Sequence, residues 1–279
     1  MDFDWEHPEL YDAVERALAE DIGAGDITTQ LTVAPGRRAA GKFYARDEMV
    51  LAGVELLPLI YECRGGVEGL ELKVASGARC TDGQTIAEVE GLAATLLECE
   101  RTALNFMQRL SGVATLASRF AAEVAHTKCK VLDTRKTTPG LRRLEKMATA
   151  AGGVTNHRMG LFDAVLIKNN HIAAAGGVRH ALKLALPSGM PVEIEVRTRE
   201  ELDEALACGA KRLLLDNLTP PEAREWIAYV GGRASCEISG GVTLATVRAY
   251  AEAGADFVSS GAITHSAIAK DLNFRLALL

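Results

Sequence analysis

From Lys130 onward the chain repeats one pattern: a short apolar run, a polar or glycine-containing end, and then a stretch with helical spacing. Parallel strands need crossover connections, usually helices, which then cover both faces of the sheet. The repeat therefore predicts about six parallel strands, at residues 131–132, 164–167, 192–196, 213–215, 235–238 and 257–259. No glycine-rich dinucleotide fingerprint follows the first strand and no phosphate-binding P-loop occurs, which favours an α/β barrel over a Rossmann or P-loop fold.

The first part of the chain has a different pattern of apolar and polar residues. Residues 9–20 have apolar positions at helical spacing, and short strand-like pieces separated by turns fill residues 39–90, which predicts a small α+β unit. The apolar stripe from Leu96 to Val124 predicts either one long amphipathic helix or two helices meeting near Gly112. This segment is expected to join two domains.

Composition limits the possible partners. The net charge of -6 argues against bulk attraction to nucleic acid or to an anionic membrane, so any anion site must be local. The six cysteines have neither disulfide-like nor zinc-like spacing and are interpreted as reduced thiols. The N-terminus is acidic where a signal peptide would be basic, and no apolar run reaches about 18 residues, so we expect a cytoplasmic protein with no membrane partner.

Charged and polar residues follow each predicted strand. In an α/β barrel the C-terminal strand ends face one another across the mouth, so residues distant in sequence converge there. A single charged loop residue is most simply a solvated charge, but a succession of six such ends predicts an active site. The ends are Asp133–Thr137, Lys168–His171, Glu195 with Arg197, Asp216–Asn217, Ser239–Gly241 and Ser259–Gly261.

Three kinds of chemistry are expected in this mouth. The two glycine-bearing ends, with Ser239, Gly240 and Gly261, lie where barrels commonly bind phosphate; a tight turn is the alternative, and a phosphate-bearing substrate is favoured. Glu195 and Asp216 could hold Mg²⁺ or ribose hydroxyls, or could merely neutralise neighbouring bases.

The third kind is cationic. A histidine such as His157 usually bonds to backbone, but beside Arg158 and opposite other bases it indicates a cup for a ligand with several carboxylates or phosphates. The other bases of this cup are Arg135, Lys136 and Lys168.

Taken together, several strings resemble the quinolinate phosphoribosyltransferase family along nearly the whole chain. They are EDIGAGDITT at 20–29, ERTALN at 100–105, DTRKT at 133–137, NHR at 156–158, LIK at 166–168, LDN at 215–217 and GAITHS at 261–266. The resemblance implies an incomplete parallel α/β barrel with a smaller N-terminal α+β sandwich domain. We expect boundaries at residues 1–112 for the sandwich with its linking helix, 113–268 for the barrel, and 269–279 for a tail that returns to the first domain.

The same resemblance implies a reaction. Family members join quinolinate to phosphoribosyl pyrophosphate with Mg²⁺, releasing pyrophosphate and CO₂ and giving nicotinate mononucleotide for NAD synthesis. It also implies a homodimer, or a hexamer built from dimers, in which Arg101 reaches the partner's site.

The remaining roles are assigned by the same resemblance, position by position. Lys136, Lys168, Glu195 and Asp216 are expected to be catalytic, with Glu195 and Asp216 also near Mg²⁺. The expected substrate-binding residues are Arg101, Arg135, His157, Arg158, Lys168, Ser239, Gly240, Gly261 and His265.

Two positions depart from the family pattern. Asn169 stands where the family usually has aspartate, and Val154 stands where it usually has a third glycine. Two other functions therefore remain open. One is a relative with the same fold acting on another aromatic acid, of the nicotinate type or the type encoded beside molybdate-transport genes. The other is a phosphosugar aldolase-type barrel with Lys168 as Schiff-base lysine.

Overall fold

The computed structural model describes residues 3–279. The described chain divides into two compact units. The N-terminal unit contains residues 3–118, 138–153 and 266–279, and the barrel unit contains residues 119–137 and 154–265. This division differs from the expected one, which placed the first boundary at residue 112 and assigned residues 138–153 to the barrel.

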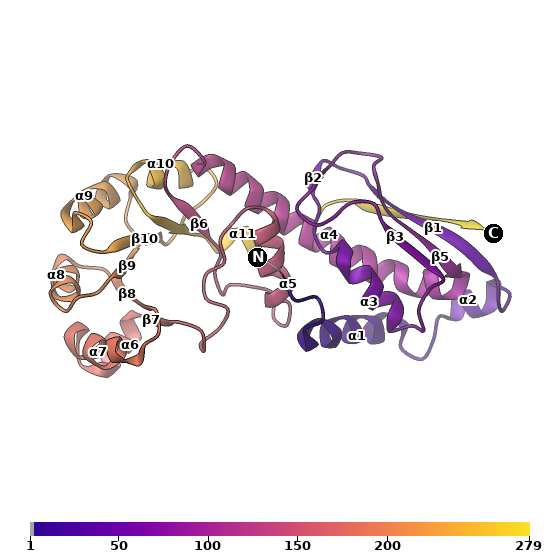
Figure 1. Cartoon of the computed structure of the whole chain (residues 1–279), viewed down its shortest axis with the longest axis horizontal. Helices are drawn as coiled ribbons and strands as arrows, with labels where there is room; N and C mark the ends of the chain where they lie inside the picture. Colours follow the sequence, from indigo (N-terminus) through magenta and orange to yellow (C-terminus); the bar gives the residue numbers. More distant parts are fainter. Residues whose placement is uncertain (1–2) are drawn as a thin grey trace. The chain divides into compact units, whose positions relative to one another are not determined.

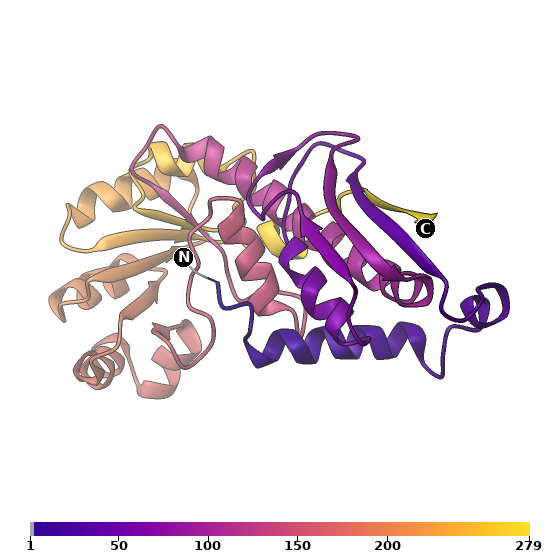
Figure 2. The ribbon, with the colours of Figure 1, turned by 45° about the vertical axis from the view of Figure 1, so that its right-hand side comes forward.

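The N-terminal unit is an α+β structure built on an antiparallel sheet with the strand order β12-β1-β5-β3. Its elements are α1 (Pro8–Ile22), α2 (Ile27–Thr32), β1 (Arg38–Ala45), β2 (Met49–Val50), a 3-10 turn (Val54–Leu56), α3 (Leu57–Glu62), β3 (Gly69–Leu72), β4 (Arg79–Cys80), β5 (Thr85–Leu92), α4 (Ala93–Val124), α5 (Arg142–Ala151) and β12 (Leu272–Leu278). Buried and exposed residues alternate along β1, as expected when only one sheet face is covered. Apolar residues of α1, α3, α4 and α5 share a core with that face (Figures 1 and 2).

The last strand comes from the far end of the chain. β12 pairs antiparallel with β1 over seven residue pairs, from Ala39 opposite Leu278 to Ala45 opposite Leu272. In Figure 1 it is the yellow strand beside the indigo β1. The Phe43 and Phe274 rings lie 4.7 Å apart between these two strands. The C-terminal segment is therefore part of the N-terminal core.

Helix α4 is continuous through Gly112, so of the two sequence possibilities the single long helix is the one observed. A Cβ at position 112 would lie 2.3 Å from the carbonyl oxygen of Ile268. Glycine is required there because the backbone of the C-terminal segment crosses the helix at this point. The cost of glycine within a helix, about 1 kcal/mol, is accepted for this close approach.

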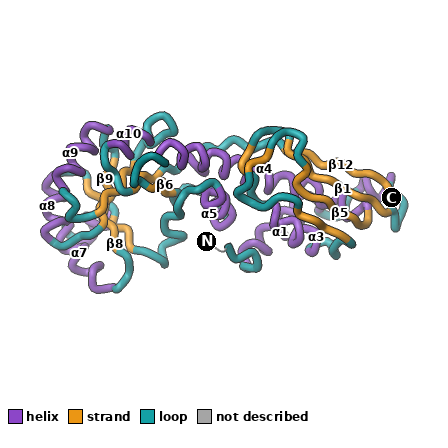
Figure 3. Tube along the Cα trace, turned by 45° about the horizontal axis from the view of Figure 1, so that its top comes forward, coloured by secondary structure: helices purple, strands orange, loops and turns teal. Residues whose placement is uncertain are grey.

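The barrel unit contains, among the described residues, six parallel strands in the order β6-β11-β10-β9-β8-β7. Since β6 and β7 are the two edges of this sheet, the barrel is incomplete, as the resemblance implied. Figure 3 shows α7 to α10 around the outside of the strands. The elements are β6 (Lys130–Leu132), β7 (Val165–Ile167), α6 (Asn169–Ala175), α7 (Val178–Ala185), a 3-10 turn (Leu186–Ser188), β8 (Val192–Val196), α8 (Arg199–Ala207), β9 (Arg212–Asp216), α9 (Pro220–Val230), β10 (Ser235–Ser239), α10 (Val247–Glu252), β11 (Phe257–Ser259) and α11 (Ala262–His265).

Side-chain alternation along these strands decides what faces the barrel interior. Glu193 and Glu195 share one face of β8, and Glu237 and Ser239 share one face of β10. In the described chain no helix combines the length and the apolar character that crossing a bilayer requires.

Candidate active site

A cavity of about 770 Å³ lies at the C-terminal ends of the barrel strands. This is the end where α/β barrels place their active sites, and the volume suits small-molecule substrates. Arg101 lies on α4 in the N-terminal unit and is not among the described residues that line the cavity. The other predicted site residues all line it: Arg135, Lys136, His157, Arg158, Lys168, Glu195, Asp216, Ser239, Gly240, Gly261 and His265.

One side of the cavity contains two guanidinium groups, those of Arg135 and Arg158. The Arg158 side chain donates to the carbonyl oxygen of Ala164 at 2.9 Å. Burial, and then the charge of Arg135, lower the pKa of Arg158. Two like charges held this close favour an anion between or beside them, and planar guanidinium groups suit carboxylates.

Asp133 fixes the loop that contains His157 and Arg158. Its side chain is fully buried at the end of β6. One carboxylate oxygen accepts the His157 backbone N–H at 2.8 Å, and the other accepts the Asn156 side-chain amide at 2.7 Å. The sequence analysis named Asp133 only as part of a motif and assigned it no role. Its position, as a carboxylate directly after a buried strand, was the feature that could have identified it.

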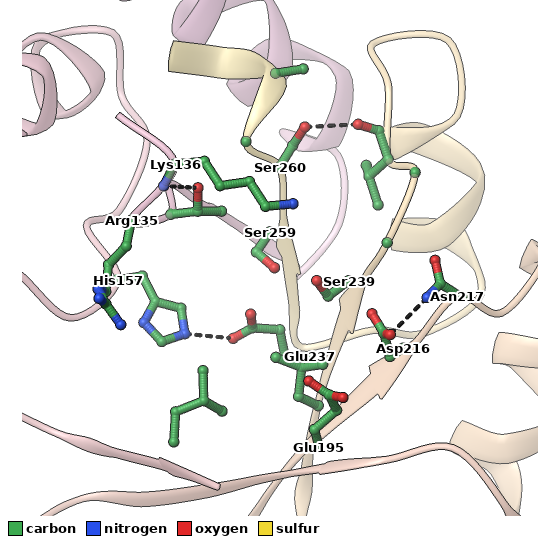
Figure 4. Close-up of a pocket in the computed structure, with 18 of the residues that line it drawn as sticks. Arg135, Lys136, His157, Glu195, Asp216, Asn217, Glu237, Ser239, Ser259 and Ser260 are labelled. Carbon is green, nitrogen blue, oxygen red and sulfur yellow. Dashed lines mark hydrogen bonds and ion pairs between the residues drawn. The ribbon is translucent and has the colours of Figure 1, made fainter. Parts of the chain in front are cut away.

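His157 is directed at two carboxylates in the barrel interior. Its Nε2 lies 3.3 Å from Glu193 Oε2 and 3.5 Å from Glu237 Oε2, and Figure 4 shows the ring pointing at Glu237. The backbone N–H of Arg158 donates to Nδ1 at 2.7 Å, which corresponds to the neutral form of the ring with its proton on Nε2. His157 therefore lines the cup with both ring nitrogens engaged by protein groups.

Arg212 completes this set. It donates to Glu193 Oε1 at 2.9 Å and to Glu237 Oε2 at 2.7 Å, and it lies 4.4 Å from the centre of the Phe257 ring. Burial opposes ionisation of Glu237, but His157 and Arg212 outweigh it and lower its pKa to about 2. Burial also opposes the charge on His157, yet the two carboxylates raise its pKa to about 9, and below that pH the proton gained by Nδ1 replaces the bond that this nitrogen accepts from Arg158.

Sequence reasoning missed Glu193, Glu237 and Arg212. The signal was their position: each is charged within a strand that is otherwise largely apolar, and a buried charge must find a partner. His157, Glu193 and Glu237 offer a nitrogen and two carboxylate oxygens within 4.8 Å of one another, which is metal-ligand chemistry. Arg212, which bonds to both carboxylates, offsets one of their two negative charges, and His157 in its charged form offsets the other, so no metal ion is required for charge balance.

The middle of the cavity is acidic. Lys168 Nζ lies 3.5 Å from Glu195 Oε2, and the side-chain amide of Asn217 donates to Asp216 at 2.7 Å. Burial, and then the charge of Glu195, raise the pKa of Asp216. A carboxylate whose ionisation is disfavoured by a neighbouring carboxylate, as in Asp216, is suited to a divalent cation, for which carboxylate oxygen is the preferred ligand.

In the order of the strands, the glycine-bearing ends of β11 and β10 lie between the end of β6, which precedes Arg135, and the ends of β9 and β8. Gly240 has a φ of 93°, and a Cβ there would lie 2.3 Å from Asn217 Oδ1 and 2.8 Å from its backbone nitrogen. A Cβ at Gly261 would lie 2.8 Å from Lys136 Cδ. These glycines leave the backbone bare toward the cavity, an arrangement that suits phosphate oxygens. The Ser260 hydroxyl donates to the Val242 carbonyl at 2.7 Å, so this serine braces the two loops together.

The two positions that depart from the family pattern lie in different settings. Asn169 begins α6 and lines the cavity, and its side-chain oxygen accepts the Asn170 backbone N–H at 2.8 Å. Val154 is buried, immediately before Thr155, which bridges to Leu132 of β6. The first departure is therefore at the mouth of the cavity and the second in the packing behind it.

A parallel α/β barrel with a cationic pair, two carboxylates and a glycine-lined end around one cavity defines an enzyme for multiply anionic substrates. Two family models cover most of the chain. The quinolinate phosphoribosyl transferase N-terminal domain matches residues 26–111, and the C-terminal domain of the same family matches residues 113–275. The chain belongs to the quinolinate phosphoribosyltransferase family and is a phosphoribosyl-transferring enzyme.

Similar proteins agree along the full length. The nicotinate-nucleotide pyrophosphorylase (carboxylating) of Mycobacterium leprae is 40% identical over 281 residues, covering 98% of this chain and 99% of the relative. Among solved structures, the nicotinate-nucleotide pyrophosphorylase of Francisella tularensis has a TM-score of 0.90 and 36% identity, covering 97% of this chain and 96% of its own. That of Ehrlichia chaffeensis has a TM-score of 0.92 and 32% identity, covering 99% and 100%.

Proposed function

We propose that this enzyme transfers the phosphoribosyl group of phosphoribosyl pyrophosphate to quinolinate with decarboxylation, giving nicotinate mononucleotide, pyrophosphate and CO₂ in NAD biosynthesis. The observation that supports this most directly is the set of residues that line a single cavity. Arg135 and Arg158, Glu195 and Asp216, and Gly240 and Gly261 all line it. A dicarboxylate, a ribose and a 5′-phosphate require one basic, one acidic and one glycine-lined environment of this kind.

Catalysis follows from the charges. Arg135 and Arg158 hold the quinolinate carboxylates and so orient the ring nitrogen toward the ribose. Lys136 and Lys168 stabilise the departing pyrophosphate. The ribose carbon becomes cationic as pyrophosphate leaves, and Glu195 and Asp216 stabilise that charge. Decarboxylation then leaves an electron pair on the adjacent ring carbon, which the alkylated, positive nitrogen stabilises, and that carbon takes up a proton from water to give nicotinate mononucleotide.

The arrangement of Glu195 and Asp216 fits Mg²⁺, either directly or through water. When bound, Mg²⁺ would neutralise charge on the pyrophosphate. The residues that we assign to the 5′-phosphate are Ser239, Gly240 and Gly261, and His265 is a further candidate in the same mouth.

A second copy of the chain is part of this proposal. Arg101 is exposed on α4 and lies outside the residues that line the cavity of its own chain. We assign it to the quinolinate subsite of a partner in a homodimer, or in a hexamer built from dimers, in the cytoplasm.

Parallel turnover assays with quinolinate, nicotinate and nicotinamide test the proposal, each with and without Mg²⁺. We expect release of CO₂ and pyrophosphate when quinolinate is the aromatic substrate, and not when nicotinate or nicotinamide replaces it. That turnover should be lost when Mg²⁺ is chelated. Turnover that prefers nicotinate would instead favour a same-fold relative acting on another aromatic acid. Borohydride trapping of a substrate on Lys168 would favour the aldolase alternative, which the ion pair between Lys168 and Glu195 already disfavours.

A further inference from the structure

The buried charged set beneath the cavity, formed by His157, Glu193, Arg212 and Glu237, has a feature that the reaction does not explain. Glu237 lines the cavity and its side chain is fully buried, so a carboxylate lies at the floor of a site for dianions. A carboxylate there repels such a ligand at short range in a low-dielectric setting. Its charge has to be offset for the ligand to bind.

Arg212 provides that offset from the other end of the barrel. It is the first residue of β9, whereas Asp216 is the last, and it is not among the described residues that line the cavity. Its guanidinium group donates to one carboxylate on each neighbouring strand, Glu193 on β8 and Glu237 on β10. The Phe257 ring covers the guanidinium group.

The bonds of this set form a chain that ends at the ligand side. Arg212 holds the two carboxylates, the carboxylates hold His157 by Nε2, and His157 Nδ1 holds the backbone N–H of Arg158. Arg158 is one of the two guanidinium groups assigned to quinolinate. A substitution of Arg212 can therefore affect quinolinate binding in two ways: it changes the net charge beside the ligand, and it changes the positions of His157 and Arg158.

We propose that Arg212 is a positioning residue for dicarboxylate binding, which offsets one of the two negative charges of Glu193 and Glu237 from outside the cavity and keeps His157 and Arg158 in place. The identity of the dicarboxylate as quinolinate rests on the function proposed above. Ser259, beside Gly261, also hydrogen-bonds to Glu237, but the set reaches the cavity mainly through His157 and Arg158, so the effect should fall mainly on quinolinate.

The test compares four variants with the wild-type protein. For each protein we measure quinolinate binding by calorimetry and the KM of each substrate. We expect Arg212→Met to weaken quinolinate binding by about tenfold or more, with the KM for phosphoribosyl pyrophosphate changed by less than about threefold. Arg212→Lys keeps the charge and should restore most of the affinity. The double variant Arg212→Met/Glu237→Gln, which removes opposite charges together, should bind within about threefold of the wild type. Arg248→Met, which removes an exposed ion pair with Glu123 in the same unit, is the matched control and should bind normally.

Equal weakening of both substrates, or failure of the double variant to regain quinolinate affinity, would overturn the proposal. If Arg212→Met does not fold, Glu237→Gln decides: quinolinate binding at least as tight as wild type supports charge compensation, and weaker binding contradicts it. A wild-type protein that does not bind quinolinate would instead refute the proposed function.

Discussion

Lys168 Nζ and Glu195 Oε2 lie 3.5 Å apart across the ends of two adjacent strands, β7 and β8. The pair places an ammonium group and a nearly buried carboxylate at the centre of the cavity. In the proposed reaction these two groups face opposite charges, the leaving pyrophosphate and the cationic ribose. Glu195→Gln should therefore lower kcat by about 10²-fold or more, because the carboxylate acts on charge that develops in the transition state. Quinolinate binding measured by calorimetry should change little, and a variant with normal kcat would remove Glu195 from catalysis.

Arg135→Ala should weaken quinolinate binding much more than binding of phosphoribosyl pyrophosphate. Loss of one charge-assisted contact costs about 1.5–3 kcal/mol, or roughly 10- to 150-fold in the quinolinate dissociation constant. Arg248→Ala, on the barrel surface, is the control. Equal loss for both substrates would contradict the assignment of Arg135 to the carboxylates.

Arg101 can be tested by mixing two impaired proteins. At quinolinate concentrations below saturation Arg101→Ala and Arg135→Ala should each have strongly reduced activity, yet a mixture refolded together should regain about a quarter of wild-type activity, since half of randomly formed dimers are hybrids with one intact site. Each variant refolded alone provides the baseline. No recovery in a mixture with demonstrated hybrid dimers would show that Arg101 serves its own chain or none.

His157 should titrate near pH 9, well above the ordinary value of 6.5, when followed by NMR of the imidazole nitrogens. A raised pKa means that the stabilisation from the charged ring is complete below the ordinary value and is lost as the pH rises through about 9. Above that pH the proton should remain on Nε2, because the Arg158 N–H donates to Nδ1. Glu237→Gln should lower the midpoint, and an unchanged midpoint would refute the contribution of Glu237.

Gly240→Ala should impair the phosphate end. Its methyl group would collide with Asn217, so either the backbone or Asn217 must move. We expect a KM for phosphoribosyl pyrophosphate raised about tenfold or more, with a loss of stability of about 1–3 kcal/mol. Gly232→Ala has a comparable positive φ of 75° with nothing within 4 Å, so it separates strain from collision. Similar KM values for the two variants would contradict the prediction.

The convergence of the strand ends could be predicted from the sequence. Each apolar run indicates a strand, the polar residues that follow it mark the end of that strand, and a parallel barrel brings those ends together. The charged set of Glu193, Arg212 and Glu237 could not be predicted in the same way. A lone charge inside a strand indicates a partner but not which one, until the register of β8, β9 and β10 is known. The roles of the predicted site residues remain predictions, although their convergence around one cavity is observed.

Residues 138–153 show another limit of the sequence. The repeat of strand and helix suggested that the helix after β6 would cover the barrel. Instead Leu144, Met147 and Ala148 of α5 belong to the core of the N-terminal unit. Both placements bury an amphipathic helix equally well in terms of periodicity, so only tertiary packing decides between them.

The pairing of β12 with β1 sets an order of events during synthesis. β1 is made early, but the strand that covers its outer edge is made only after the whole barrel has been synthesised. Until then β1 presents an unpaired edge, which is a template for pairing with other chains. Nascent or truncated chains that end before residue 272 should therefore depend on chaperones more than the finished protein does.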